Sequence, residues 1–248
     1  MQDLKMHCLC YVGKEPKRIQ YNQHNIMCGS INYTWDDMVQ LQSHGYIMDH
    51  YGEHISHMNG DFGSLTGLFW VWKNSASRYK GINTYRIFWD EDFNLKPNRV
   101  YIPEAKDIVT AIKGHAPNVN SVYDHYSYCH NSLGWQLLYG LAGDSNIPIT
   151  ISMIEQLKTH RYLTPFHMFI AEEGIFNKIC EILFRIIFDF HTNYHFALSE
   201  ISKRSFGQTR FYDFFAERLF HIIVTNHHYF LGNVDVTQLK VLDLNHYD

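Results

Sequence analysis

The stretch SLTGLFWVWKN (residues 64–74) runs through a short polar connection into YKGINTYRIFW (residues 79–89), and together they indicate the class of fold. The first segment carries apolar residues at about 100° per residue, which predicts an amphipathic helix. Its apolar stripe consists of Leu65, Leu68, Phe69 and Trp72. The second segment reads as one buried strand. A helix that leads into a buried strand is typical of α/β proteins.

The same alternation of helix and strand extends in both directions. The alternating segment LKMHCLCYVG (residues 4–13), which ends at a glycine, predicts an opening strand that runs into a loop. Thr34 before WDDMVQLQSHG predicts a capped helix that ends at Gly45. Residues 99–107 predict another strand, and residues 164–190 predict a strand followed by a long helix. We therefore expect a mainly parallel sheet flanked by helices, with the ligand site beyond the carboxyl ends of its strands. The segments 194–205 and 210–228 predict a helical C-terminal extension.

Composition and charge narrow the classes of function. The 248 residues are 46% hydrophobic and 19% charged, which is typical of a globular chain, and we expect a single domain. The net charge is −4 and the 21 Lys and Arg residues are scattered, so a nucleic-acid partner is not expected. The five cysteines lack paired CxxC spacing, which favours a reducing cytoplasm.

The chain carries no segment that reads as a membrane or export signal. The start MQDLKMHCLCYVG lacks the pattern of a secretory signal. The apolar stretch EILFRIIFDF (residues 181–190) is interrupted by Arg185 and Asp189 and is shorter than the ~20 residues that span a bilayer. We expect a soluble or at most peripheral protein.

The second face of the 64–74 helix is mixed in character. Trp70 could stack on a planar ring and Lys73 could neutralise a phosphate, while Gly63 and Gly67 would let a ligand approach closely. The alternative is an exposed tryptophan beside a solvated lysine.

Three segments in order carry a resemblance to a known family. They are GEHISHMN (52–59), SLTGLFWVWKN (64–74) and KGINTYRIF (80–88), and the match extends through HMFIAEEGIFNKICEILF (167–184) and FFAERLFHI (214–222). The chain thus resembles, over about residues 45–225, the bacterial capsular-polysaccharide-synthesis glycosyltransferases. That family has long been catalogued only as a domain of unknown function, and some members are linked to galactofuranose transfer.

The resemblance implies a GT-A-like, Rossmann-like hexosyltransferase that uses a nucleotide-diphospho-sugar, most simply a UDP-sugar such as UDP-galactofuranose. The acceptor would be a glycan in capsule, O-antigen or other surface polysaccharide synthesis. It could be lipid-linked, which would bring the protein to the inner face of the cytoplasmic membrane. Residues 1 to about 175 would form the nucleotide-sugar-binding α/β core, and residues from about 176 to 248 would form the helical C-terminal part. The residues that we expect to bind the donor are Gly52, His54, Ser56, Asn59, Thr66, Trp70, Lys73, Asn74, Tyr85, His167 and Arg218.

Several positions depart from the family pattern. His54 and His167 stand where the family has Asn, and Ser64 stands where it has Glu. Thr84 replaces a family His, and Ile87 replaces a second Arg. These departures leave open a non-catalytic relative that binds carbohydrate or nucleotide sugar.

Glycosyl transfer needs charge on the leaving diphosphate and a base for the acceptor hydroxyl. Arg86 is a candidate for the charge, although an arginine inside an apolar strand could equally form a structural ion pair. Asp90 and Asp92 could hold Mg²⁺ or Mn²⁺, or form a solvated turn.

Glu217 and Glu53 are the candidate bases that the resemblance supplies, with Glu172 and Glu173 as further options. Glu217 with Arg218 could equally be a structural salt bridge. An inverting single displacement is the preferred mechanism.

A different class of function begins with His50, His54 and His57 at i, i+4 and i+7. On one face of a helix they could bind zinc, with Glu53 as base, in a metallohydrolase. Gly52 and Ile55 weaken that helix, and no HExxH motif is present.

Overall fold

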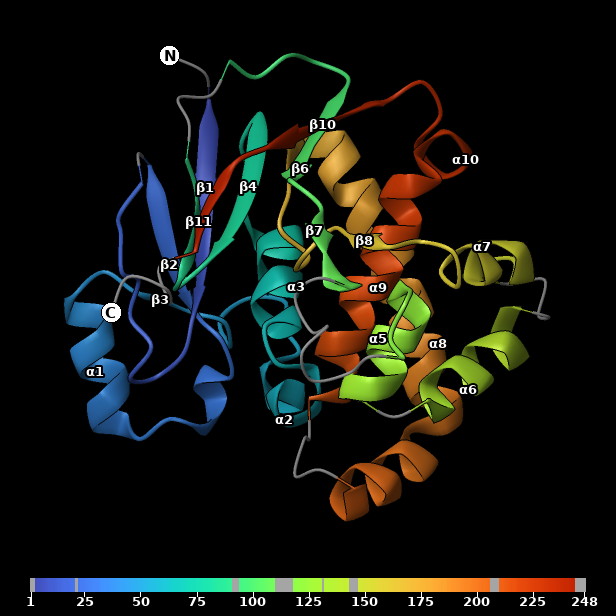
Figure 1. The fold of residues 1–248 in the computed structure, drawn as a ribbon. Helices are drawn as coiled ribbons and strands as arrows, with labels where there is room; N and C mark the ends of the chain where they lie inside the picture. The colour runs from blue at the N-terminus through green and yellow to red at the C-terminus, as the bar shows by residue number, and fades with distance from the viewer. Residues whose placement is uncertain are drawn as a thin grey trace.

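The computed structural model describes residues 3–20, 22–90, 94–109, 118–130, 132–142, 147–205 and 210–243 (Figure 1). A sheet of seven strands lies against a group of helices, in the order β10-β6-β9-β4-β1-β2-β3. Its strands are β1 (Leu4–Cys10), β2 (Gln23–Met27), β3 (Ile47–Met48), β4 (Tyr79–Thr84), β6 (Arg99–Pro103), β9 (Ile170–Glu172) and β10 (Asp235–Leu239). The α/β fold with a mainly parallel sheet is confirmed.

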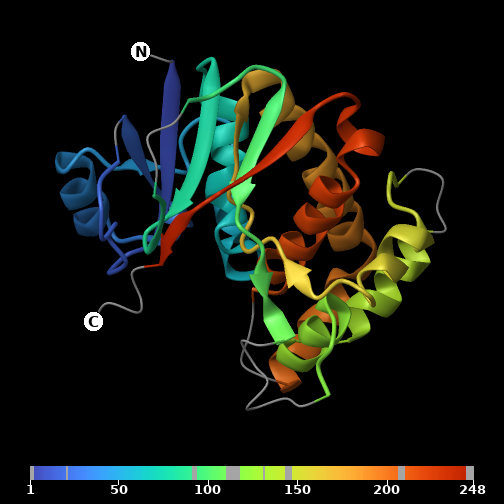
Figure 2. The ribbon, with the colours of Figure 1, turned by 45° about the horizontal axis from the view of Figure 1, so that its top comes forward.

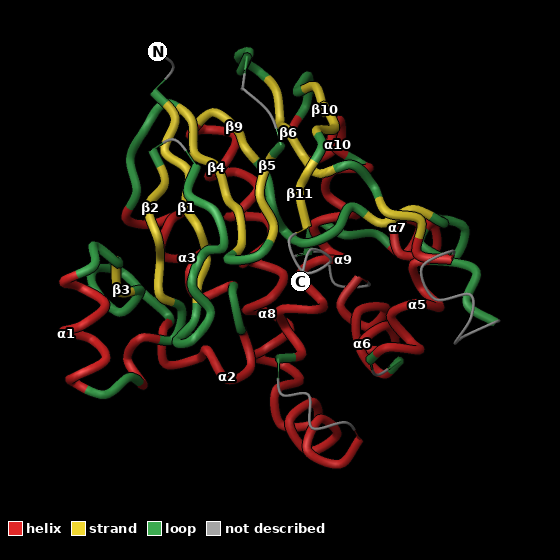
Figure 3. Tube along the Cα trace, turned by 60° about the vertical axis from the view of Figure 1, so that its left-hand side comes forward, coloured by secondary structure: helices red, strands yellow, loops and turns green. Residues whose placement is uncertain are grey.

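The direction of β9 decides where a ligand can lie. β1 pairs in parallel with β2 and β4, whereas β9 is antiparallel to both β4 and β6. The residues that precede β9 therefore lie at the same edge as the residues that follow β1 and β4. Figure 3 shows these strands side by side, with helices behind them.

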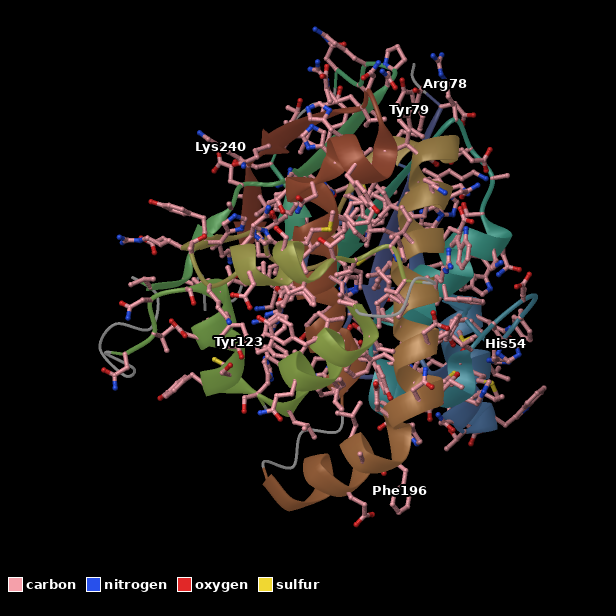
Figure 4. All side chains as sticks on the ribbon, turned by 90° about the vertical axis from the view of Figure 1, so that its right-hand side faces the viewer. His54, Arg78, Tyr79, Tyr123, Phe196 and Lys240 are labelled. Atoms are coloured by element: carbon pink, nitrogen blue, oxygen red, sulfur yellow. The ribbon has the colours of Figure 1, made fainter. Side chains whose placement is uncertain are left out.

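The larger core lies between the sheet and the helices α3 (Leu65–Asn74), α8 (Glu173–Ser205) and α9 (Phe211–Thr225). Leu65 and Leu68 are fully buried, as their stripe predicts, and Trp72 stacks on Phe184 of α8 with ring centroids 5.6 Å apart. The far end of α8 extends beyond this core, and Phe196 there is 82% exposed (Figure 4). The shorter helices on this side are α2 (Asn59–Phe62), α5 (Val122–Cys129), α6 (Leu133–Ala142), α7 (Ile151–Gln156) and α10 (His227–Leu231).

A smaller core, which includes Cys8, Cys10 and Phe88, is covered in part by residues of α1 (Trp35–Ser43). Thr34 caps α1 and forms a reciprocal capping box with Asp37, so the predicted start of this helix is confirmed. Two small ribbons complete the fold. β5 (Ile87–Trp89) pairs with β11 (Val241–Asp243), and β7 (Lys106–Asp107) pairs with β8 (Tyr162–Leu163).

The structure corrects two expectations. Residues 79–89 are not one strand, because the chain bends at Tyr85 and Arg86 between β4 and β5. The Tyr85 N–H donates to the Leu9 carbonyl at 3.1 Å, and the Tyr85 carbonyl accepts from Lys17. The C-terminal part is not wholly helical either, because β10 returns to the sheet and pairs in parallel with β6 (Figure 2).

In the described residues, no helix combines the length and the apolar character that a membrane crossing requires. The five cysteines are free thiols.

Candidate active site

A pocket of about 190 Å³ opens at the sheet edge where β1 and β4 end. We call it the central pocket. Tyr11 follows β1, Tyr85 and Arg86 follow β4, and Phe166 and His167 precede β9. Its lining residues are Leu9, Tyr11, Ser64, Ile82, Thr84, Tyr85, Arg86, Phe166, His167, Met168, Arg210, Asp213, Phe214 and Glu217. The pocket therefore occupies the place that the sheet topology favours for a ligand.

The first turns of α9 supply the polar wall of the central pocket. Arg210, Asp213 and Glu217 recur at intervals of three and four residues, so they share one face of this helix. Glu217 also holds the segment before β9, because its Oε1 accepts the Phe166 N–H at 2.6 Å. Phe166 has a positive φ of 60°, which is uncommon for a bulky residue. The contact therefore helps to hold the chain in the shape that presents His167.

A network of three side chains lies in the wall of the central pocket. The Ser64 hydroxyl donates to Asp213 Oδ1 at 2.6 Å and lies 3.0 Å from His167 Nε2. Burial raises the pKa of Asp213, and His167, Ser64 and Arg210 partly offset this rise. The Asp213 carboxyl is therefore held ready to exchange a proton nearer neutral pH than an exposed aspartate.

Two buried polar atoms of this pocket lack a hydrogen-bond partner among the described residues. They are His167 Nδ1 and the Tyr11 hydroxyl oxygen. The Tyr11 hydroxyl lies near the Ser64 hydroxyl, whose hydrogen is already donated to Asp213. Burial raises the pKa of Tyr11, so its hydroxyl stays protonated. Unpartnered buried polar atoms are costly, and a ligand rich in hydroxyl groups would satisfy both.

Two arginines, Arg86 and Arg210, line the central pocket and supply positive charge. The Arg86 guanidinium lies 5.7 Å from the centre of the Tyr85 ring and makes no ion pair with a described carboxylate. Arg210 lies over the Phe214 ring at 5.6 Å. Guanidinium groups suit the oxygens of a phosphate because they donate from a planar fork.

Residues 33–228 match the model of a protein family described as a domain of unknown function (DUF4422). The chain belongs to this family. The matched range contains every lining residue of the central pocket except Leu9 and Tyr11.

A solved structure with the same fold is described as a "WbbM bifunctional glycosytransferase apo structure". The TM-score is 0.66 at 18% sequence identity, and the alignment covers 97% of this chain. It covers 45% of the other chain, so the chain spans less than half the length of that protein. No curated protein matches the sequence.

Of the residues predicted for the site, the structure brings Tyr85, Arg86, His167 and Glu217 to the central pocket of this DUF4422 member. Arg218 lies next to Glu217 but turns away from the pocket. It is 2% exposed, pairs with Glu217, and approaches His125 Nδ1 at 3.0 Å. Its guanidinium also lies over the Tyr126 ring, so Arg218 contacts α5 rather than the pocket.

Other predicted residues lie together at a different place, which we call the α3 clamp: residues 51–53 held against Trp70, Lys73 and Asn74. The Asn74 side chain accepts from the Glu53 N–H at 3.0 Å and donates to the Glu53 carbonyl at 2.9 Å. Trp70 Nε1 donates to the Tyr51 carbonyl at 2.6 Å. Glu53 is 64% exposed and pairs with Lys73 at 3.3 Å. In the α3 clamp these side chains thus hold a loop in place. That they also bind the nucleotide-sugar donor stays a prediction.

Ser56, Asn59 and Thr66 also hold the backbone of neighbouring loops. Ser56 donates to the buried Asp49 carboxylate at 2.5 Å, which also accepts the N–H groups of residues 29 and 30. The Asn59 side chain donates to the Gly63 carbonyl at 2.8 Å and to the Thr66 hydroxyl at 3.1 Å.

The structure does not provide the helix on which the zinc hypothesis depends. Residues 50–55 form bends and loop, and only Ser56–Met58 form a 3₁₀ turn. His50 instead lies 2.8 Å from the Ser30 hydroxyl, and His54 Nδ1 accepts from the Ser56 N–H. Figure 4 shows His54 near the surface, on the side of the molecule that carries α2 and α3. No three His, Cys, Asp or Glu side chains lie where they could share a metal ion, in the part of the chain that the structure describes.

The proposed carboxylates for Mg²⁺ or Mn²⁺ do not form a set of ligands in the described residues. Asp90 is exposed at the end of β5, and its N–H donates to the Lys240 carbonyl at 3.1 Å. Asp92 lies outside the described residues. A divalent cation in this pocket would need several oxygen ligands, whereas the described lining offers two carboxylates, of which Glu217 is held through both oxygens by Phe166 and Arg218. The pocket therefore fits an arginine-lined anion site better than a metal centre.

The sequence did not predict Tyr11, Arg210 or Asp213 as site residues, and it did not predict that Ser64 lines the pocket. One signal was present, because Asp213 precedes Glu217 by one helical turn and so shares its face. The others depend on contacts between distant segments.

Proposed function

We propose that the chain is a glycosyltransferase that moves a sugar from a nucleotide-diphospho-sugar to a hydroxyl of a glycan acceptor. The observation that carries the proposal is the central pocket, which combines the Asp213 carboxylate, two arginines and two unpartnered buried polar atoms at the carboxyl edge of the sheet. The shared fold with a bifunctional glycosyltransferase supports it.

The size of the central pocket suits the transferred sugar. Its volume of about 190 Å³ is below the ~300–1,000 Å³ of sites that enclose drug-sized ligands. We infer that it holds one sugar ring and not a whole nucleotide sugar. His167 Nδ1 would accept from a sugar hydroxyl, and the Tyr11 hydroxyl would bond to another.

An adjoining cavity of about 460 Å³ is available for the nucleoside. It shares Tyr11 with the central pocket and lies between the loop after β1 and α1. Tyr46 supplies a second aromatic ring, and Glu15 offers a carboxylate to ribose hydroxyls. In this arrangement the diphosphate would lie between the two cavities, within reach of Arg86.

The reaction that these residues support is a single displacement. The acceptor oxygen bonds to the anomeric carbon, the bond from that carbon to the phosphate oxygen breaks, and the diphosphate leaves with the electron pair. Arg86 and Arg210 stabilise the charge that develops on the diphosphate. The proton of the acceptor hydroxyl passes to a carboxylate of the pocket. We propose inversion at the anomeric carbon and a UDP-hexose, such as UDP-galactofuranose, as the donor.

The family resemblance adds the setting of the reaction. We propose an acceptor in capsule, O-antigen or other surface polysaccharide, carried on a lipid at the inner face of the cytoplasmic membrane. A peripheral contact with that membrane would then bring the pocket to its acceptor.

A panel of UDP-, GDP- and dTDP-sugars tests the proposal. We expect at least one UDP-sugar to raise the melting temperature and to release UDP in the presence of a glycan acceptor. Binding without transfer to any acceptor would favour the alternative of a carbohydrate-binding relative. No binding by any member of the panel would contradict the proposal.

A further inference from the structure

The central pocket contains two carboxylates, and their contacts differ in a way that separates their roles. Glu217 uses both oxygens within the fold. Its Oε1 accepts the Phe166 N–H at 2.6 Å, and its Oε2 pairs with the buried Arg218 guanidinium. A proton on Glu217 would weaken contacts that hold Phe166 and Arg218 in place. Glu217 is therefore suited to holding the pocket wall and poorly suited to taking a proton in each turnover.

One oxygen of the Asp213 carboxyl accepts no hydrogen bond from a described side chain, and the Ser64 backbone N–H also stabilises the ionised carboxyl. Asp213 Oδ1 accepts the Ser64 hydroxyl at 2.6 Å, whereas no described side chain bonds to Oδ2. Gly63 lies against Oδ2, and a Cβ at that position would come within 2.6 Å of it. Gly63 has a φ of +52°, a conformation that an L side chain rarely adopts. The absence of a side chain at Gly63 thus leaves this space to Asp213 Oδ2 and to the Arg210 side chain.

Ser64 and His167 fix the direction of the Asp213 carboxyl. Because the Ser64 hydroxyl donates its hydrogen to Asp213, it can only accept from His167 Nε2, which lies 3.0 Å away. His167 therefore carries its proton on Nε2 when neutral, and its unpartnered Nδ1 is an acceptor. His167 is 7% exposed, so this orientation is held by a buried ring.

We propose that Asp213 is the catalytic base of the transfer and that Ser64 and His167 are the residues that position it. The inference rests on the proposed function. The acceptor O–H bond breaks and its proton passes to Asp213 Oδ2, while the acceptor oxygen bonds to the anomeric carbon and the diphosphate leaves. The serine hydroxyl remains bonded to Oδ1 throughout, so the carboxyl cannot rotate away from the acceptor.

Among the described residues, the charged and titratable groups that face Asp213 come from four segments. Arg210 lies on its own helix, His167 precedes β9, Tyr11 follows β1, and Cys28 follows β2. Burial raises the pKa of Asp213, and the Ser64 hydroxyl opposes this by stabilising the ionised form. Removal of that hydroxyl should raise the pKa further, so the acid limb of kcat/KM should move to higher pH.

The test compares Asp213→Asn and Ser64→Ala with Asp235→Asn, an exposed aspartate outside the central pocket. For Asp213→Asn we expect UDP-sugar affinity within threefold of the unaltered chain and a loss of kcat of about 10²–10⁴-fold. For Ser64→Ala we expect a smaller loss of kcat and the acid limb shifted to higher pH. Asp235→Asn should behave as the unaltered chain does.

Transfer by Asp213→Asn at a third or more of the normal rate would overturn the assignment while leaving the proposed function intact. An acid limb that Ser64→Ala does not move would remove Ser64 from the positioning role, even if Asp213→Asn failed to fold. A chain that binds no nucleotide sugar would overturn the assignment and the proposed function together.

Discussion

The α3 clamp and the central pocket are built in opposite ways. The α3 clamp joins residues close in sequence, and its Trp70, Lys73 and Asn74 bond to a loop only about 20 positions away. The central pocket joins Ser64 to His167 and Asp213, which are 103 and 149 positions distant. The residues that carry the family resemblance on α3 are therefore largely different from the residues that line the central pocket.

The largest expected effect concerns the buried pair beside the central pocket. Arg218→Ala leaves the Glu217 carboxylate, which is 16% exposed, without its partner. Breaking a buried ion pair from one side costs about 3–5 kcal/mol, so we expect a loss of that size in the free energy of unfolding, measured by urea denaturation.

Lys178→Ala is the control for this change, because Lys178 is 51% exposed and, among the described residues, pairs only with Glu181 on the same helix. It should change stability by less than about 0.5 kcal/mol. Equal effects of the two substitutions would show that the Glu217–Arg218 pair does not hold the wall of the central pocket.

A smaller loss is expected for Gly52→Ala in the α3 clamp. Gly52 has a φ of +75°, and a Cβ there would lie 2.2 Å from Asn74 Oδ1. The strained conformation and the weakened Asn74 hydrogen bonds should together cost about 2–3 kcal/mol.

Gly45→Ala separates the two causes, because Gly45 ends α1 with a φ of +79° and has no described atom within 4 Å of the added carbon. It should cost only the ~1–2 kcal/mol of the left-handed backbone. If both variants melted at the same temperature, the contact between Gly52 and Asn74 would add nothing to stability.

The sequence predicted those parts of the fold that local pattern controls. The helix over 64–74 and the cap at Thr34 follow from periodicity and from a side chain that bonds three residues ahead. The break at Tyr85 could not be predicted in this way, since it depends on bonds to Leu9 and Lys17 from other segments. The strand β10 likewise depends on an edge that β6 provides.

The residues of the candidate site also differ in whether local sequence pattern or distant contacts determine them. Tyr85, Arg86, His167 and Glu217 were predicted from the sequence and lie in the central pocket. Asp213 was not predicted, because its contacts with Ser64 and His167 exist only when α9, α3 and the segment before β9 meet. Lys73 was predicted from its charge, which the structure pairs with Glu53.

Our central proposal is that the donor binds at the carboxyl edge of the sheet, in place of the donor contacts that the sequence predicted for the α3 clamp. Calorimetric titration of a UDP-sugar into Arg86→Ala and Lys73→Ala tests it most directly, because each variant removes one cation. We predict that Arg86→Ala weakens binding at least tenfold, which corresponds to about 1.4 kcal/mol, and that Lys73→Ala stays within twofold of the unaltered chain. Weaker binding by Lys73→Ala together with unchanged binding by Arg86→Ala would contradict the account.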